Sequence, residues 1–208
     1  MTHKEIAEQS RKQLLQAGIK LFGSKGYEAT SVVDIEKNLK QTRGAIIYHF
    51  KSKLGFFEAT VNKYYLGRIM PASVPEECRN SLKEFYTKFV SMLEEECMEL
   101  MNSGVRNVAG TFINLETDAL RSIPNFRQKC KEFNDRQILV FELVIGRAIH
   151  NGELKSGIVP SVIAEMFMNV VTGQTYRANC EGYTYYTDGM LRQFNSLYRL
   201  ITNQQNND

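Results

Sequence analysis

The chain has 208 residues, of which 43% are hydrophobic and 24% are charged, with only four prolines and a formal net charge of +3. This composition excludes a disordered or fibrous chain and predicts a folded protein of one large or two small domains. The four cysteines lie 19 or more positions apart, which excludes a Cys-x-x-Cys zinc ribbon. No apolar run approaches the roughly 18 residues of a membrane span. We therefore expect a cytoplasmic protein without a membrane partner.

The basic residues are concentrated at the N-terminal end. Residues 1–53 carry ten Lys and Arg against five Asp and Glu, whereas residues 54–208 carry 16 against 18. A basic terminal module on a near-neutral body is typical of proteins whose head binds a polyanion. This asymmetry is the first indication of a nucleic-acid partner.

Apolar residues recur at spacings of three and four along the chain, which predicts an all-α fold of about nine helices. Hydroxyl residues stand where a side chain can cap the first turn of a helix, and glycines stand where a helix can end. The four helices expected in the N-terminal part run over residues 6–23, 31–39 capped by Thr30 or Ser31, 43–50 capped by Thr42, and 53–70 capped by Ser52.

Pro71 and Pro75 interrupt the helical pattern, because neither fits comfortably inside a helix. We expect a three-helix head over residues 1–53 and a larger helical body over residues 54–208. The five helices expected beyond the prolines run over residues 79–102, 105–121, 125–150, 160–179 and 185–201.

The two short helices of the head, 31–39 and 43–50, are joined by a tight turn, as in a helix-turn-helix. In that arrangement one helix braces the other, which enters the major groove of DNA. Arg43, at the start of the second helix, can donate two hydrogen bonds to a guanine. Tyr48 and His49 can contact phosphates, and Lys53 can do so together with the amides at the start of the next helix.

The residues around this helix pair resemble a known family. The chain contains the runs Leu21-Phe22-x3-Gly26-Tyr27-x2-Thr30-Ser31-x3-Ile35 and Thr42-Arg43-Gly44-Ala45-Ile46-Ile47-Tyr48-His49-Phe50-Lys51-Ser52-Lys53. Over about residues 10–60 it resembles the N-terminal DNA-binding domain of TetR-family transcriptional repressors. The resemblance implies a homodimeric, all-α repressor whose head binds double-stranded operator DNA. It also implies a divergent C-terminal domain that binds a small molecule and dimerises.

The resemblance assigns roles to single residues of the head. It implies that DNA is contacted by Thr30, Thr42, Arg43, Ala45, Ile47, Tyr48, His49 and Lys53. Three positions depart from the family pattern. Lys40 replaces a glycine of the turn, Glu36 replaces a small alanine, and Ile47 replaces a tyrosine that touches DNA. For Ile47 we expect an apolar contact instead, for example with a thymine methyl group.

The body offers aromatic side chains that can line a pocket for a mostly hydrophobic effector, whose identity the sequence does not reveal. The candidate ligand-binding residues are Tyr86, Phe89, Asn107, Thr111, Asn114, Phe133, Gln137 and Phe141. Plain core packing is the alternative for the aromatic members, and a wet surface is the alternative for the members at 107–114.

The last two predicted helices each carry an apolar stripe, which predicts a four-helix interface between two subunits. The candidate interface residues are Phe167, Val170, Met190, Phe194, Leu197 and Ile201. In a single subunit we expect them to leave large apolar stripes exposed. Packing of the same stripes within one chain is the alternative.

No catalytic constellation, cofactor motif or metal-ligand set is recognisable, and His3, His49 and His150 are scattered along the chain. The predicted function is therefore that of a DNA-binding repressor released from its operator by a small ligand. One alternative is a DNA-binding protein of the same fold controlled by a protein partner or by no ligand. A more remote alternative is a helical enzyme.

Overall fold

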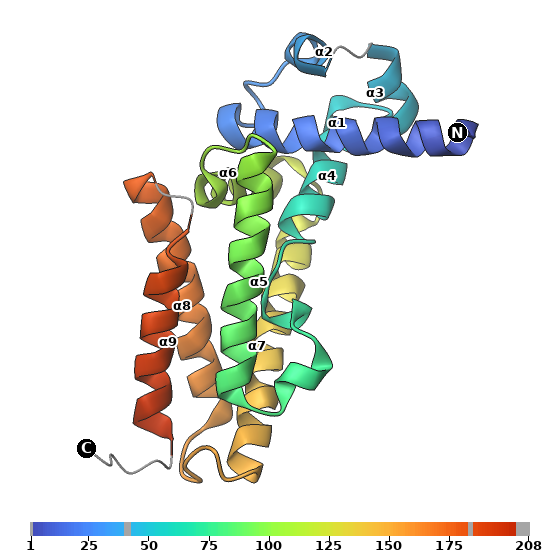
Figure 1. The fold of residues 1–208 in the computed structure, drawn as a ribbon. Coiled ribbons are helices and arrows are strands. Elements are labelled where there is room, and N and C mark those ends of the chain that lie inside the picture. Colours follow the sequence, from blue (N-terminus) through green and yellow to red (C-terminus); the bar gives the residue numbers. More distant parts are fainter. Residues whose placement is uncertain (1, 40–42, 183–184, 203–208) are drawn as a thin grey trace. The chain divides into compact units, whose positions relative to one another are not determined.

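The computed structural model describes residues 2–39, 43–182 and 185–202, and their regular structure is almost entirely helical (Figure 1). Within these ranges the chain forms nine α-helices, one π-helical turn and two 3-10 turns. A single antiparallel bridge joins Leu154 and Thr202. The predicted all-α fold with about nine helices is confirmed.

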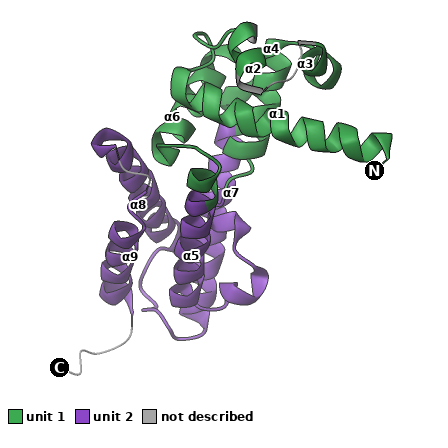
Figure 2. Ribbon diagram, turned by 45° about the horizontal axis from the view of Figure 1, so that its top comes forward, with its two compact units in different colours: residues 1–68, 99–129 green, residues 69–98, 130–208 purple. Residues whose placement is uncertain are grey.

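The chain divides into two compact units (Figure 2). Unit 1 comprises residues 1–68 and 99–129, and unit 2 comprises residues 69–98 and 130–208. The unit that holds the expected reading head thus includes a later part of the chain as well. The functional division predicted between residues 53 and 54 stays a prediction.

Unit 1 contains the N-terminal helices together with one helix from the middle of the chain. Its elements are α1 (His3–Lys25), α2 (Val32–Leu39), α3 (Arg43–Phe50), α4 (Lys53–Thr60), the π-helical turn Val61–Tyr65 and α6 (Val108–Ser122). Four aromatic rings form its core: Phe22 lies 5.3 Å from Phe56 and 5.0 Å from Phe57, and Phe56 lies 4.9 Å from Phe50.

Unit 2 contains the greater part of two long helices and all of the last two. Its elements are the 3-10 turns Pro71–Ser73 and Glu76–Arg79, most of α5 (Leu82–Asn102) and α7 (Phe126–His150), α8 (Pro160–Glu181) and α9 (Thr187–Ile201). None of the helices within the described ranges is both long and apolar enough to cross a membrane.

Local signals explain several helix ends. Thr2 and Glu5 form a capping box that starts α1 at His3, three residues earlier than expected. Gly182 ends α8 in the left-handed conformation, with φ at 74°. The fourth helix was expected to run to about Met70, but its α-helical part ends at Thr60, where the π-helical turn follows.

The core of unit 2 contains a series of aromatic rings tilted against one another. Phe141 lies 5.2 Å from Phe167, which lies 4.9 Å from Phe194, and Tyr86 lies 5.5 Å from Phe194. All four side chains are fully buried within the single chain.

This packing corrects one expectation about the last two helices. Phe167, Met190 and Phe194 do not leave exposed stripes in a single subunit, because they are fully buried within it. The alternative, packing within one chain, holds for these three residues. Val170 and Leu197 are half-buried. The exposed apolar side chains of α8 and α9 are Val162, Met166, Tyr176 and Leu200.

Candidate nucleic-acid interface

The third helix, α3, divides its side chains between the core and the solvent. Ile46 and Phe50, four positions apart, are 2% and 6% exposed and anchor the helix in the core of unit 1. Ile47 and Tyr48 lie on the other side and are 47% and 69% exposed. The helix is therefore held by one face and offers an apolar side chain and a phenol to the solvent on the opposite face. That is the arrangement a recognition helix requires.

Two predicted recognition residues lie at or beyond the edge of what the structure describes. Thr42 and the departure at Lys40 lie outside the described residues. Arg43 is the first residue of α3. Ala45 and His49 are half-buried, whereas Gly44 is exposed, and Glu36 lies half-buried on α2.

The turn between α3 and α4 brings the backbones of the two helices into close contact. Lys51 adopts a positive φ of 68°, and the Ser52 hydroxyl accepts a hydrogen bond of 2.9 Å from the Gly55 amide. A Cβ atom on Gly55 would lie 2.2 Å from the carbonyl oxygen of Phe50. Only glycine therefore lets the first turn of α4 approach the end of α3. The amides at this helix start can attract a phosphate.

Lys53 lies close to the segment that precedes α2. Its ammonium lies 4.3 Å from the centre of the Tyr27 ring and 3.5 Å from the carbonyl oxygen of Glu28. The Tyr27 ring stacks on Phe57 at 4.6 Å. A cation over an aromatic face at a half-exposed site gains about 0.5–1 kcal/mol. This attraction orients Lys53 while leaving part of its surface accessible to a phosphate.

The sequence left Thr30 and Ser31 as alternative caps of α2, and the structure gives this role to Ser31. The Ser31 hydroxyl accepts from the Asp34 amide at 3.1 Å, and the Asp34 carboxylate accepts from both the amide and the hydroxyl of Ser31. Hydrogen bonds from the backbone and side chain of Ser31, with a further one from Lys25, hold the pKa of Asp34 well below its ordinary value. Ser31 therefore caps α2.

Thr30 has a different role from the phosphate contact expected of it. Its side chain is fully buried, and its hydroxyl donates to the carbonyl oxygen of Gly26 at 2.7 Å. A buried hydroxyl offers no surface to a phosphate. In this structure the hydrogen bond from Thr30 to Gly26 stabilises the segment between α1 and α2.

Arg11 is a basic residue that the sequence analysis did not single out. Its guanidinium lies over the Phe50 ring at 5.4 Å. Partial burial, and then the nearby charge of Arg11, lower the pKa of His49. The helical spacing of Arg11, Leu15 and Gly18 on α1 was the available signal, because these positions share the face that meets α4.

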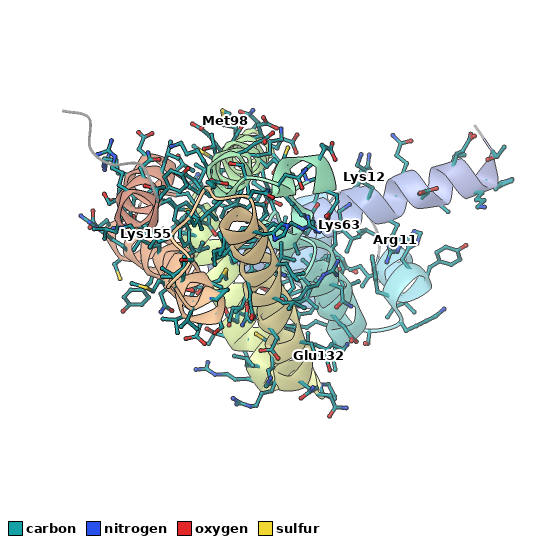
Figure 3. All side chains as sticks on the ribbon, turned by 90° about the horizontal axis from the view of Figure 1, so that it is seen from below. Arg11, Lys12, Lys63, Met98, Glu132 and Lys155 are labelled. Atoms are coloured by element: carbon teal, nitrogen blue, oxygen red, sulfur yellow. The ribbon has the colours of Figure 1, made fainter. Side chains whose placement is uncertain are left out.

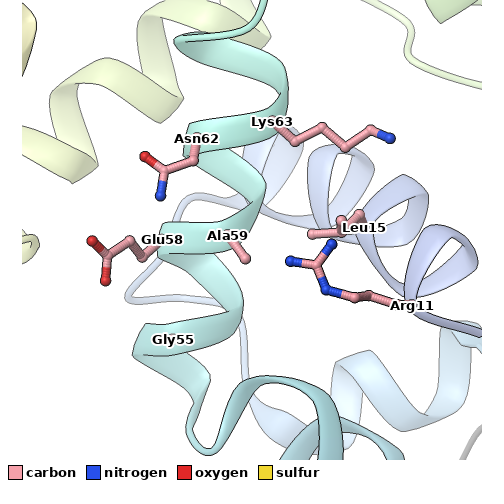
Figure 4. Close-up of a pocket in the computed structure, with 7 residues that line it drawn as sticks. All are labelled: Arg11, Leu15, Gly55, Glu58, Ala59, Asn62 and Lys63. Carbon is pink, nitrogen blue, oxygen red and sulfur yellow. The ribbon is translucent and has the colours of Figure 1, made fainter. Parts of the chain in front are cut away.

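A groove of about 440 Å³ runs between α1 and α4 beside Arg11. Its lining residues are Arg11, Leu15, Gly55, Glu58, Ala59, Asn62 and Lys63 (Figure 4). Arg11 extends from α1 toward Ala59 (Figure 4), and Figure 3 places Arg11, Lys12 and Lys63 along the same part of the chain's surface. Glu58 is paired with Lys129 at 3.1 Å, so the positive charges dominate this groove.

The candidate ligand residues fall in both compact units. Asn107, Thr111 and Asn114 lie in unit 1, where Asn107 caps α6 by accepting from the Gly110 amide at 2.8 Å. The other candidates, Tyr86, Phe89, Phe133, Gln137 and Phe141, lie in unit 2.

Two polar candidates of unit 2 already have partners. The Gln137 side chain accepts from the Ala72 amide at 2.9 Å and donates to the carbonyl oxygen of Phe133 at 2.9 Å. The Tyr86 hydroxyl donates to Asn195 at 2.8 Å, and burial is the main reason why the pKa of Tyr86 is raised well above its ordinary value. These hydrogen bonds hold both side chains in place within unit 2.

Two further hollows lie in unit 2. One, of about 610 Å³, is lined at its apolar part by Leu143, Gly146 and Pro160. The other, of about 210 Å³, lies between α8 and α9 and is lined by polar residues that include Arg177 and Arg192. Neither hollow is lined by a candidate ligand residue. Within the described ranges, no three His, Cys, Asp or Glu side chains gather as a metal site would require.

The fold and the exposed face of α3 define an all-α protein with a helix-turn-helix head. Residues 14–60 match the sequence model of bacterial regulatory proteins of the tetR family. Over this segment the chain is similar to the tetR family, and the resemblance predicted from the sequence is confirmed.

Individual relatives support the same placement. The chain is 30% identical over 95 residues to the uncharacterized HTH-type transcriptional regulator YuxN of Bacillus subtilis, which covers 44% of this chain and 32% of YuxN. It is 26% identical over 130 residues to IcaR of Staphylococcus aureus, a negative regulator of the biofilm operon icaADBC, which covers 57% of this chain and 70% of IcaR. The chain thus spans about a third of the length of YuxN.

The whole fold is similar to that of solved regulators. A TetR-family transcriptional regulator from Cytophaga hutchinsonii superposes with a TM-score of 0.67 at 18% identity, over 99% of this chain and 100% of that one. At this identity the likeness establishes the shared all-α fold.

Proposed function

We propose that this chain is a DNA-binding transcriptional repressor that works as a homodimer in the cytoplasm, where operator DNA lies. The observation that carries the proposal is the exposed face of α3, with Ile47 and Tyr48 turned outward from a firmly packed head. The excess of basic over acidic residues in residues 1–53 supplies the attraction to phosphates. The family match over residues 14–60 supports the same function.

Each part of the head has a proposed task at the operator. Arg43 and Ile47 read base edges in the major groove, with Ala45 beside them. Tyr48, His49 and Lys53 contact the flanking phosphates. Arg11, next to His49, extends the same basic surface.

The proposed dimer pairs α8 and α9 of two subunits around a two-fold axis. Val162 and Met166 lie four positions apart and exposed on α8, so they share one face of that helix. Val170 and Leu197, which are half-buried, remain interface candidates, whereas Ile201 is buried within the single chain. A two-fold pair of heads matches an operator with two half-sites one or more DNA turns apart.

The proposed control is release from DNA by a small, mostly hydrophobic ligand bound in the body. The ligand would have to bind more tightly to dimers in which the distance between the two heads does not match the operator. It can weaken DNA binding only by the size of that difference in affinity. The closely spaced aromatic rings of unit 2 and the hydrogen-bonded side chains of Gln137 and Tyr86 favour a second candidate. In that candidate the regulator answers to a protein partner or to no ligand. Neither candidate involves catalysis.

Selection of bound sites from random duplex DNA by the full-length protein tests the proposal. A two-fold symmetric site should emerge, and Ile47→Glu should bind it poorly, because a carboxylate would face the phosphates and base edges of the groove. Since Ile47 is exposed, this variant should keep the thermal stability of the wild type. Failure to enrich any sequence, with the protein folded, would refute the function.

A further inference from the structure

Two polar side chains of α6 hold the end of α1. The Asn114 amide donates to the carbonyl oxygen of Gly23 at 2.8 Å, and the Asp118 carboxylate accepts from the Tyr27 amide at 2.6 Å. Asn114 and Asp118 lie four positions apart, so they project from the same face of α6. Both backbone groups lie at or just after the end of a helix, where they have no partner within the helix itself.

The surfaces of the two segments fit closely around these hydrogen bonds. A Cβ atom on Gly23 would lie 2.4 Å from the Thr111 side chain, so only glycine allows α1 to approach α6 at this point. Gly26 has a φ of 82°, and a Cβ atom there would lie 3.1 Å from the Asp118 carboxylate. The segment from Gly23 to Tyr27 therefore packs closely against α6.

The same segment also fixes the reading helices. The Thr30 hydroxyl donates to Gly26 at the start of α2, as described above. The Tyr27 ring stacks on Phe57 of α4, and the Lys53 ammonium lies 4.3 Å from the centre of the Tyr27 ring. The start of α2 and the first turns of α4 are thus both tied to backbone that α6 holds.

We propose that Asn114 and Asp118 are positioning residues for DNA reading, although they lie outside residues 14–60 and touch no DNA themselves. The proposal rests on the function proposed above. Specific binding needs the head in one orientation, and the apparent affinity falls in proportion to the fraction of molecules that hold it. The two hydrogen bonds raise that fraction. Non-specific binding depends on phosphate charge and tolerates other orientations.

Variants at Asp118 separate positioning from charge. Asp118→Asn keeps a carbonyl oxygen that can accept from Tyr27, whereas Asp118→Ala does not. We expect Asp118→Ala to bind the selected operator about tenfold more weakly, as the loss of one charge-assisted hydrogen bond would cause, and Asp118→Asn to bind it within about twofold of the wild type. Binding to random-sequence duplex should change little in either variant. Thr117→Ala, on the same helix, is the matched control and should resemble the wild type.

Repulsion between the Asp118 carboxylate and DNA would have the opposite effect on operator binding. If Asp118 acted only by repelling DNA, both substitutions would tighten binding to operator and random duplex alike, and this outcome would overturn the proposal. Asn114→Ala provides a second variant should Asp118→Ala fold poorly, and it too should weaken operator binding selectively. An equal loss on operator and random DNA in both alanine variants would also overturn it.

Amide hydrogen exchange of the DNA-free dimer distinguishes failure of this proposal from failure of the proposed function. In Asp118→Ala, the amides of Tyr27, α2 and α3 should exchange faster, whereas the amides of unit 2 should keep their wild-type rates. Unchanged exchange in α2 and α3 would overturn the positioning role even if the wild type binds an operator. If the wild type selected no DNA but Asp118→Ala still exchanged faster, the DNA-binding function would be refuted. The role of α6 in holding the segment before α2 would stand.

Discussion

Replacing Gly55 by alanine tests the close approach of α3 and α4 on which the proposed interface depends. The new Cβ atom would lie 2.2 Å from the carbonyl oxygen of Phe50, and such contacts essentially never fall below 3.0 Å. The two backbones must therefore separate by about 0.8 Å or more. Because the obstacle is a backbone atom, no side-chain rotation relieves it.

The expected change in stability is the balance of two effects. Alanine is favoured over glycine in a helix by up to about 1 kcal/mol. Forcing extra volume into a packed site costs about 1–3 kcal/mol, and a backbone obstacle places this variant at the upper end. We expect a net loss of about 1–2 kcal/mol in the free energy of unfolding, or a melting temperature lower by roughly 3–6 °C. Operator affinity should fall as well, since α3 is displaced.

Gly146→Ala is the matched control for this prediction. Gly146 lies within α7, and a Cβ atom there would meet nothing within 4 Å. Only the helix preference remains, so the melting temperature should rise by roughly 2–4 °C. Differential scanning calorimetry of both variants gives the comparison. If Gly55→Ala stabilised the protein as Gly146→Ala does, the close contact between α3 and α4 would not exist in solution.

Three further measurements examine other parts of the molecule. Lys53→Ala should weaken binding to all DNA sequences and reduce the slope of log affinity against log salt by about one unit, and an unchanged slope would exclude a phosphate contact by Lys53. The folded-state pKa of Asp34 is depressed, so the stabilising effect of its carboxylate should be present above about pH 4 and lost as the pH falls. The difference in melting temperature between wild type and Asp34→Asn should shrink on acidification, and a constant difference would argue against the hydrogen bonds from Ser31 to the Asp34 carboxylate. Met166→Glu should yield folded monomers in light scattering, because the side chain is exposed on α8, whereas Phe194→Glu should unfold the chain, because Phe194 is fully buried; a dimeric Met166→Glu would place the interface elsewhere.

The local features of this protein could be read from the sequence. The α3 helix lies at residues 43–50 as predicted, and Ser52 caps α4 as expected. Helix periodicity and capping act between residues only a few positions apart, so the sequence displays them directly. The TetR resemblance was recognisable for the same reason, since its pattern occupies one continuous segment.

What the sequence could not decide was which side chains meet across long separations. Thr30 was a candidate phosphate contact until its burial showed that it fastens Gly26. Asn114 was a candidate for a pocket, yet it binds Gly23, 91 positions earlier in the chain. Phe194 fitted a dimer interface and a subunit core equally well as one member of an apolar stripe. A helical pattern specifies which face is apolar or polar, but the partner of that face is set by how whole helices pack, and only the tertiary structure determines it.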